Sequence, residues 1–152
     1  MVDYKLLARQ VEELAQAEPW YVPLLSNASA LLYDTLPDLN WAGFYLMREG
    51  RLVLGPFQGK VACIHIDLGK GVCGTAAGED RTVLVPDVHR FPGHIACDTA
   101  SNSEIVVPIH TGDRVVAVLD LDSPSLERFS QVDQEGLETF AQCLEGAIHW
   151  DS

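Results

Sequence analysis

The sequence is poor in basic side chains. Ten lysines and arginines stand against 22 aspartates and glutamates, so the 152-residue chain has a formal net charge of −12 with histidine neutral. Affinity for nucleic acids depends on basic groups that neutralise backbone phosphates. We therefore do not expect a protein with this charge balance to bind nucleic acid.

Long apolar runs are also missing. The longest uninterrupted aliphatic run covers residues 115–119, whereas a membrane-spanning helix needs about 20 apolar residues. The first residues carry charges within an amphipathic pattern and do not resemble a signal peptide. The sequence therefore predicts neither membrane insertion nor export.

Cysteine is scarce as well. The chain has four cysteines, far below the roughly 8–10% of disulfide-stapled secreted proteins. Because no export signal is visible, we expect the thiols to lie in a reducing, cytoplasmic environment. The spacing of Cys63, Cys73 and Cys97 matches neither a Cys-x-x-Cys redox motif nor a compact zinc motif. No metal is therefore expected, although a zinc site is a minor alternative that would add a histidine, namely His65, His89 or His94.

Apolar residues at three- and four-residue steps predict helices near both ends of the chain. Two helices are expected within residues 3–36, one ending before Pro19 and the next before Pro37, because proline lacks a backbone N–H. Another helix is expected over residues 130–149, where Ser130 and Asp133 resemble a capping box. Its buried stripe comprises Leu137, Phe140, Ala141, Leu144 and Ile148.

Between these helices the apolar period changes to two, which predicts strands and loops over residues 41–122. A first hairpin turns at Glu49-Gly50, with Trp41 and Tyr45 on one face, and a second turns at residues 111–113. Residues 55–102 between the hairpins are largely irregular. Strands bracketed by helices, without regular alternation, predict an α+β fold with an antiparallel sheet. No repeat or linker is visible, so residues 1–152 are expected to form one domain.

The second hairpin is expected to bring three carboxylates together. A three-residue loop pairs His110 with Arg114 and places Glu104 directly opposite Asp120. Asp122 lies two residues further along the same face. Because like charges across a ladder are destabilising, these groups suggest a pocket for a cation, or a carboxyl that stays protonated. A solvated strand end is the equal alternative, and a two-residue loop would scatter the cluster.

The cysteines permit more than one reading. Cys73 lies near a predicted helix start, where the helix dipole favours a thiolate. Cys97 follows His94 in a loop that is expected to expose its thiol. Cys143 lies beside the stripe of the last helix and fits best as a small buried hydrophobe.

Four segments together carry a resemblance to a known family. They are GPFQGKVAC at 55–63, GKGVCG at 69–74, FPGHIACD at 91–98 and SEIVVP at 103–108. This combination closely resembles the free methionine-(R)-sulfoxide reductases, which are enzymes with a GAF fold. The likeness covers residues 41–122, and the flanking helices suit a GAF domain. The resemblance therefore implies a single GAF domain whose central antiparallel sheet is flanked by N- and C-terminal helices.

The resemblance also implies a reaction. Cys97 would attack the sulfur of free L-methionine-(R)-sulfoxide and become a sulfenic acid, as part of a response to oxidative stress. Cys63 would resolve the sulfenic acid as a disulfide that thioredoxin reduces, with Cys73 as an alternative or second resolving thiol. Trp41 and Tyr45 match positions that line the substrate pocket. No metal or organic cofactor is implied, and a homodimer is possible.

The acidic residues acquire roles from the same resemblance. Glu104, Asp120 and Asp122 match positions that hold the substrate ammonium and interact with the sulfoxide oxygen. The backbone N–H groups of residues 93–96 are candidate donors to the substrate carboxylate. A site that pairs both charged ends should accept only the free amino acid. The alternatives are a GAF module that binds a small molecule without catalysis, and a thiol-based redox sensor.

Overall fold

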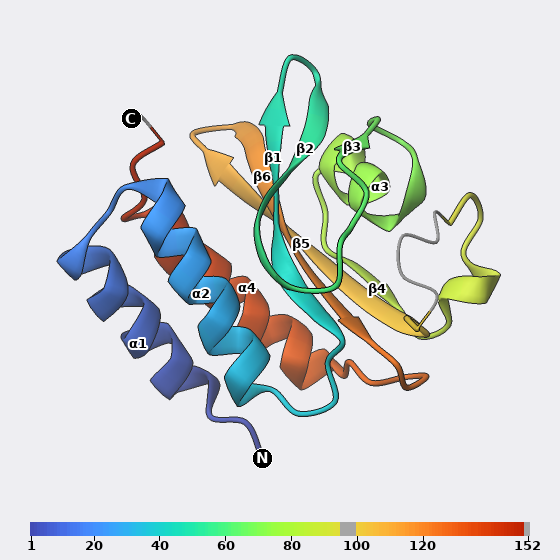
Figure 1. The fold of residues 1–152 in the computed structure, drawn as a ribbon, viewed down its shortest axis with the longest axis horizontal. Coiled ribbons are helices and arrows are strands. Elements are labelled where there is room, and N and C mark those ends of the chain that lie inside the picture. The colour runs from blue at the N-terminus through green and yellow to red at the C-terminus, as the bar shows by residue number, and fades with distance from the viewer. Residues whose placement is uncertain (95–99, 151–152) are drawn as a thin grey trace.

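The computed structural model describes residues 1–94 and 100–150, so Cys97 lies outside the described residues. Its centre is an antiparallel six-stranded sheet with strand order β3-β2-β1-β6-β5-β4. Helices α1, α2 and α4 cover one face of this sheet, and α3 lies on the other (Figure 1). The elements are α1 (Tyr4–Ala17), α2 (Tyr21–Thr35), β1 (Trp41–Arg48), β2 (Arg51–Gly59), β3 (His65–Ile66), α3 (Gly71–Glu79), β4 (Val83–Val85), the short 3-10 helix η1 (Val88–Arg90), β5 (Ser103–Thr111), β6 (Arg114–Ser123) and α4 (Gln131–Glu145).

The predicted α+β class with an antiparallel sheet is confirmed. The helix predicted over residues 130–149 is shorter than expected, because α4 ends at Glu145. The following residues pair with the connection between α1 and α2 instead: Tyr21 N donates to the His149 carbonyl over 2.9 Å, and His149 N donates to the Pro19 carbonyl over 2.8 Å. These bonds satisfy backbone groups that a longer helix would have used. No described helix has the length and apolar character needed to span a membrane.

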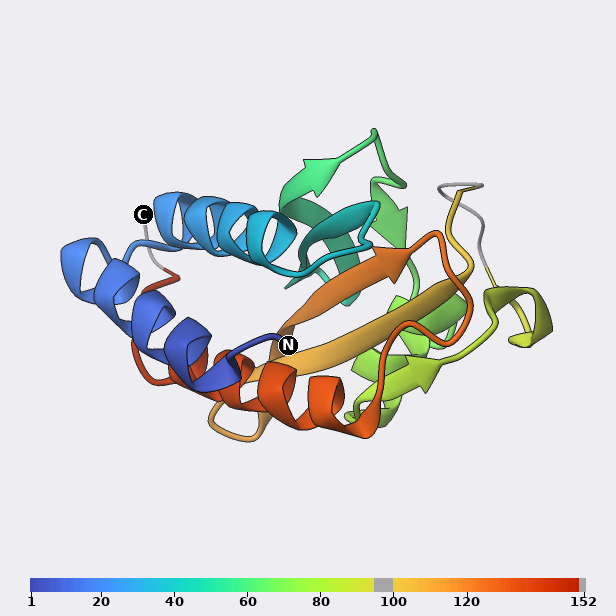
Figure 2. The ribbon, with the colours of Figure 1, turned by 90° about the horizontal axis from the view of Figure 1, so that it is seen from below.

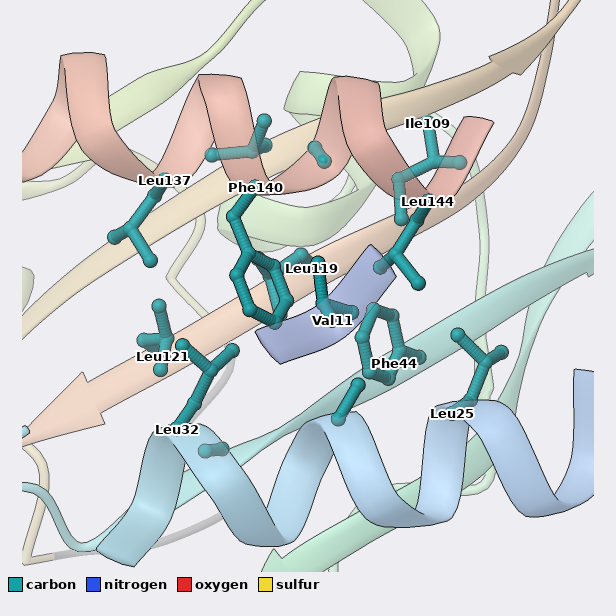
Figure 3. Close-up of a cluster of buried hydrophobic side chains, with 14 of the residues drawn as sticks. Val11, Leu25, Leu32, Phe44, Ile109, Leu119, Leu121, Leu137, Phe140 and Leu144 are labelled. Carbon is teal, nitrogen blue, oxygen red and sulfur yellow. The ribbon is translucent and has the colours of Figure 1, made fainter. Parts of the chain in front are cut away.

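The main hydrophobic core lies between the sheet and the three helices α1, α2 and α4. Figure 3 shows Phe44 and Phe140 facing each other across this layer, with leucines from the strands and helices around them. Strand β1 alternates as predicted, because Ala42 and Phe44 enter this core while Trp41 and Tyr45 point to the opposite face. The opposite face, on which α3 packs, can therefore form a pocket between α3 and the sheet.

The β5–β6 hairpin differs from its predicted register by two shifts of one residue each, which together leave every side chain on its predicted face. The turn has two residues rather than three, since Thr111 lies opposite Arg114. A β-bulge between Ile109 and His110 then adds one more shift, so Glu104 lies opposite Asp122 instead of Asp120. Because the total shift is two residues, every side chain keeps its predicted face. The carboxylates therefore stay together, although a two-residue turn alone would have separated them.

Strand β2 continues to Gly59, through part of the stretch that was predicted to be irregular. A bulge between Gly43 and Tyr45 of β1 admits Pro56 into β2, at the kind of position where a strand tolerates proline. Gly43 is required at this point, because a Cβ atom there would lie 2.3 Å from the Cβ of Phe57. The longer β2 positions the loop that contains Cys63.

Gly136 allows α1 and α4 to pack side by side (Figure 2). A Cβ atom at this position would lie 2.1 Å from the ring of Tyr4. The Tyr4 hydroxyl donates to Asp133 Oδ1 over 2.6 Å, which restricts movement of the ring. A side chain at Gly136 must therefore displace either the tyrosine or the helix.

We expect Gly136→Ala to lower the free energy of unfolding by about 1–3 kcal/mol because of this overpacking. Gly78→Ala in α3 is the matched control, because its nearest contacts would be ordinary ones, at 3.4 Å and 3.8 Å. Replacing that helical glycine should be neutral or stabilising by up to about 1 kcal/mol. Urea denaturation measures both, and equal stability of the Gly136→Ala variant and the wild type would contradict this packing.

Candidate active site

A pocket lies between α3 and the face of the sheet formed by β1, β5 and β6. Its cavity volume is about 40 Å³, which is room for a few water molecules at roughly 10–15 Å³ each. Six of the predicted site residues line it together: Trp41, Tyr45, Cys73, Glu104, Asp120 and Asp122. The hairpin register and the alternation of β1 thus bring the predicted residues to one place. Of the predicted thiols, Cys97 lies outside the described residues, and Cys63 belongs to the adjoining loop.

The three carboxylates are the dominant electrostatic feature of the pocket. Glu104 is 7% exposed and Asp120 is 5% exposed. Burial raises the pKa of Glu104 well above its usual range, and the neighbouring charges of Asp120 and Asp122 raise it further. Burial also raises the pKa of Asp120, although hydrogen bonds from Glu104 and Cys73 oppose the rise. Glu104 is therefore the carboxyl that this environment favours in its protonated form.

Cys73 behaves opposite to the thiolate that its helix position predicted. Cys73 lies in the first turn of α3. Its Sγ is 4.0 Å from Oε2 of Glu104. Burial raises the pKa of this thiol well above its usual range, and the charges of Asp120 and Glu104 add to the rise. Burial and the nearby carboxylates therefore outweigh the effect of the helix dipole on the pKa of this thiol.

Glycines set the position of α3 over the pocket. A Cβ atom on Gly74 would lie 2.3 Å from the carbonyl oxygen of Asp67, so a larger residue would displace the helix. Gly69 N also donates to the Gly74 carbonyl over 2.8 Å. The glycine-rich segment therefore serves close packing, and this packing holds Cys73 against the carboxylates.

Stacked aromatic rings form the wall opposite α3. The ring centroids of Trp41 and Tyr45 are 5.9 Å apart, and those of Trp41 and Phe57 are 5.1 Å apart. Trp41 Nε1 donates to the Lys60 carbonyl over 3.1 Å, and the Tyr45 hydroxyl donates to the Cys63 carbonyl over 2.9 Å. The wall thus holds the loop that contains Cys63. The role of Phe57 was not predicted, because it depends on the bulge in the β1–β2 ladder.

The described cysteines differ in their bonding state. Cys63 is disulfide-bonded, whereas Cys73 and Cys143 are free thiols. Cys143 is only partly buried and lies far from the pocket, where its Sγ donates to Glu12 Oε1 over 3.2 Å. Burial and this carboxylate raise the pKa of Cys143 to about 11. The bonded cysteine is therefore the one that the aromatic wall holds in place.

The side chains of two further pocket residues were not predicted to bind substrate. For His94 the predicted contact with substrate was its backbone N–H, and its side chain was considered as a zinc ligand; its Nε2 lies 4.0 Å from Glu104 Oε1. Burial lowers the pKa of His94, and nearby His89 contributes, so a neutral ring is favoured. Ser101 also lines the pocket and accepts a hydrogen bond from Asn40 Nδ2 over 3.0 Å. Neither residue carries a periodic signal, since both lie in the segment between η1 and β5.

The pocket also has the chemistry of a cation site. Donor atoms of Cys73, Glu104 and Asp120 all lie within 4.8 Å of one another. Within the described part of the chain, Asp120 Oδ1 is buried without a hydrogen-bond partner. A group that carries positive charge and several N–H donors satisfies such a set. An ammonium group fits this description, and a metal ion would use the same atoms.

Comparisons with known proteins agree with this geometry. The GAF domain family matches residues 24–149. Protein YtsP of Bacillus subtilis is 51% identical, with 96% of this chain and 91% of that protein covered. The free methionine-R-sulfoxide reductase of Escherichia coli is 49% identical, with 95% of this chain and 88% of that protein covered. A solved structure of fRMsr of Staphylococcus aureus in complex with substrate has a TM-score of 0.93 at 50% identity, and the match covers 98% of this chain and 97% of that one.

Glu104→Gln should stabilise the protein increasingly as the pH rises. The pKa of Glu104 is raised in the folded state, so its contribution to stability is complete below the ordinary value near 4.5 and is lost at higher pH. Glutamine mimics the protonated acid and does not titrate. We expect its advantage in the free energy of unfolding to grow from pH 5 to about 1 kcal/mol or more at pH 8.

Urea denaturation at the two pH values measures this difference. Glu13→Gln on the exposed side of α1 is the matched control, because it makes the same chemical change at a solvated site. A Glu104→Gln advantage that does not depend on pH would contradict the assignment of a protonated Glu104.

Proposed function

The chain belongs to the GAF-domain family of the free methionine-R-sulfoxide reductases, as its motifs predicted, and from this premise we propose that it reduces free L-methionine-(R)-sulfoxide to L-methionine. The observation that carries the proposal is the buried carboxylate cluster in the same pocket as the aromatic wall, beside the Cys63 loop. Ligand-binding folds are shared by many functions, so the site and not the fold must support the activity. Here the site offers both charge recognition and thiol chemistry.

The carboxylates supply recognition of the amino group. Asp120 and Asp122 face the pocket beside a protonated Glu104, and a substrate ammonium would donate to their oxygens. A peptide-bound methionine has an amide in place of this ammonium and would leave the buried charges unpaired. The cluster therefore favours the free amino acid.

The substrate carboxylate needs donors as well. Residues 93–96 were the predicted donors, but His94 N already donates to the Phe91 carbonyl over 3.2 Å, and residues 95 and 96 lie outside the described residues. Lys70 and the first turn of α3 line the same pocket. We assign the carboxylate to this end of α3, because a helix N-terminus favours anions.

The reaction is a two-electron reduction. Cys97, as its thiolate, attacks the sulfoxide sulfur and forms an S–S bond, while Glu104 donates a proton to the sulfoxide oxygen. The oxygen then passes to Cys97 Sγ as its bond to the substrate sulfur and the S–S bond both break, which leaves methionine and a sulfenic acid on Cys97. The Cys63 thiol then attacks the sulfenic sulfur, expels water and forms a disulfide. Thioredoxin restores both thiols, which suits a reducing compartment such as the cytoplasm. No metal or organic cofactor takes part.

Cys63 rather than Cys73 is assigned as the resolving thiol. Cys63 is the disulfide-bonded residue, while Cys73 is free. Burial beside the carboxylates raises the pKa of Cys73, which disfavours the thiolate needed for attack. Cys73 instead contributes an S–H group to the carboxylate cluster. Assembly into a homodimer stays a prediction.

We expect thioredoxin-coupled NADPH oxidation with the free R sulfoxide but not with its S epimer. Cys97→Ser should reduce turnover to background, because the nucleophile is lost. Cys63→Ser should release about one methionine per protein and then stop at a sulfenic acid, which dimedone labelling and mass spectrometry detect.

Cys143→Ser is the matched control, because it removes a thiol outside the pocket, and it should retain wild-type turnover. Persistent turnover by Cys97→Ser would overturn the mechanism. Inactivity of the fully reduced wild type with every sulfoxide would overturn the proposed function and favour a binding module.

A further inference from the structure

The segment around Cys63 exposes an unusual number of apolar side chains. Val61 is 87% exposed, Ile64 is 61% exposed and Leu68 is 41% exposed. Single exposed apolar residues are common, but a group of them marks a contact surface. Of ten exposed large hydrophobic residues in the described ranges, these three fall within eight consecutive positions. We call Val61, Ile64 and Leu68 the Cys63 collar.

The backbone of the collar is held by the pocket wall. Tyr45 donates to the Cys63 carbonyl, and Trp41 donates to the Lys60 carbonyl, one residue before the collar begins. Leu54 N of β2 donates to the Ile64 carbonyl over 2.8 Å. Three hydrogen bonds therefore fix the loop on both sides of Cys63. A surface ordered in advance loses little entropy when a partner binds.

The position of the collar fits contact with a reductant. Cys63 is only partly buried, is disulfide-bonded and lies at the centre of the collar sequence. Thiol–disulfide exchange requires a thiolate to reach the attacked sulfur directly. We propose that the Cys63 collar is the docking surface for a protein dithiol of the thioredoxin type, and that this partner attacks Cys63. This inference rests on the proposed function, which requires such a reductant in every cycle.

The local charge favours an acidic or neutral partner. Lys60 and Lys70 bracket the collar and Asp67 lies within it, so residues 60–70 carry a net charge of +1 in a chain of −12. Elsewhere the acidic surface would repel an acidic protein. The collar thus offers exposed apolar side chains between two lysines of the sequence, which suits a partner that presents apolar groups and no net positive charge.

The exchange balances in two steps. The first thiolate of the partner attacks Cys63 Sγ, forms a mixed disulfide and releases the other cysteine of the broken bond as a thiolate, which takes up a proton. The second thiol of the partner, as its thiolate, then attacks the mixed disulfide and releases Cys63, which is protonated in turn. Two electrons pass to this chain, and the partner leaves as a disulfide.

The test compares two reductants in Ile64→Ser/Leu68→Ser. These positions are exposed and do not line the pocket, whereas Val61 does and is left unchanged. We expect kcat/KM for thioredoxin to fall about tenfold or more through lost apolar contact. Turnover driven by dithiothreitol and the KM for the sulfoxide should stay unchanged, since a small dithiol needs no docking surface.

Leu126→Ser/Val132→Ser is the matched control, because these residues are 56% and 62% exposed but lie outside the collar. Unchanged efficiency in this control supports the assignment, and a loss equal to that of the collar variant overturns it. An undiminished kcat/KM for thioredoxin in the collar variant also overturns it, as does wild-type turnover with dithiothreitol but not with thioredoxin. Failure of the wild type with both reductants would instead refute the proposed function.

Discussion

The structure depends on one electrostatic constraint, which is that three carboxyl groups share a buried face of β5 and β6. Two neighbouring strands rarely bury like charges opposite one another, because repulsion and desolvation both oppose it. Here Glu104 and Asp122 are direct partners, and Asp120 is one pleat away. A raised pKa at Glu104 removes one of the charges. The remaining negative charge is stored in a pocket where a cation of the right size can pair with it.

The rest of the molecule supports this costly arrangement. On the opposite face of the sheet, the core around Phe44 and Phe140 has the dense apolar packing that stabilises a domain (Figure 3). On the pocket face, Gly74 allows α3 to approach and shield the carboxylates, while Trp41 and Tyr45 close the other side. The same two aromatic residues hold the Cys63 loop, so one wall connects the carboxylate pocket to the disulfide-bonded cysteine.

Much of this architecture could be predicted from the sequence, because it depends on periodicity. The helical stripes, the alternation along β1 and the shared face of the carboxylates all follow from side-chain direction. The pairing of Glu104 with Asp122 could not be predicted in this way, because the two-residue turn and the bulge near His110 do not alter the pattern of apolar residues. The pKa of Cys73 was predicted in the wrong direction because local helix position was considered without the distant strands. Contacts that depend on a bulge, such as the stacking of Phe57 on Trp41, share this non-local origin.

The central claim is that buried carboxylates recognise the free ammonium of an amino acid. The most direct measurement is the ratio of kcat/KM for free L-methionine-(R)-sulfoxide to that for its N-acetylated form, with dithiothreitol as reductant so that no protein partner intervenes. Loss of a buried charge pair costs about 2–5 kcal/mol, so the account predicts that acetylation lowers kcat/KM by roughly 30-fold to 4,000-fold. Equal efficiency with both compounds would contradict the proposal, because the carboxylates would then have no part in selecting the substrate.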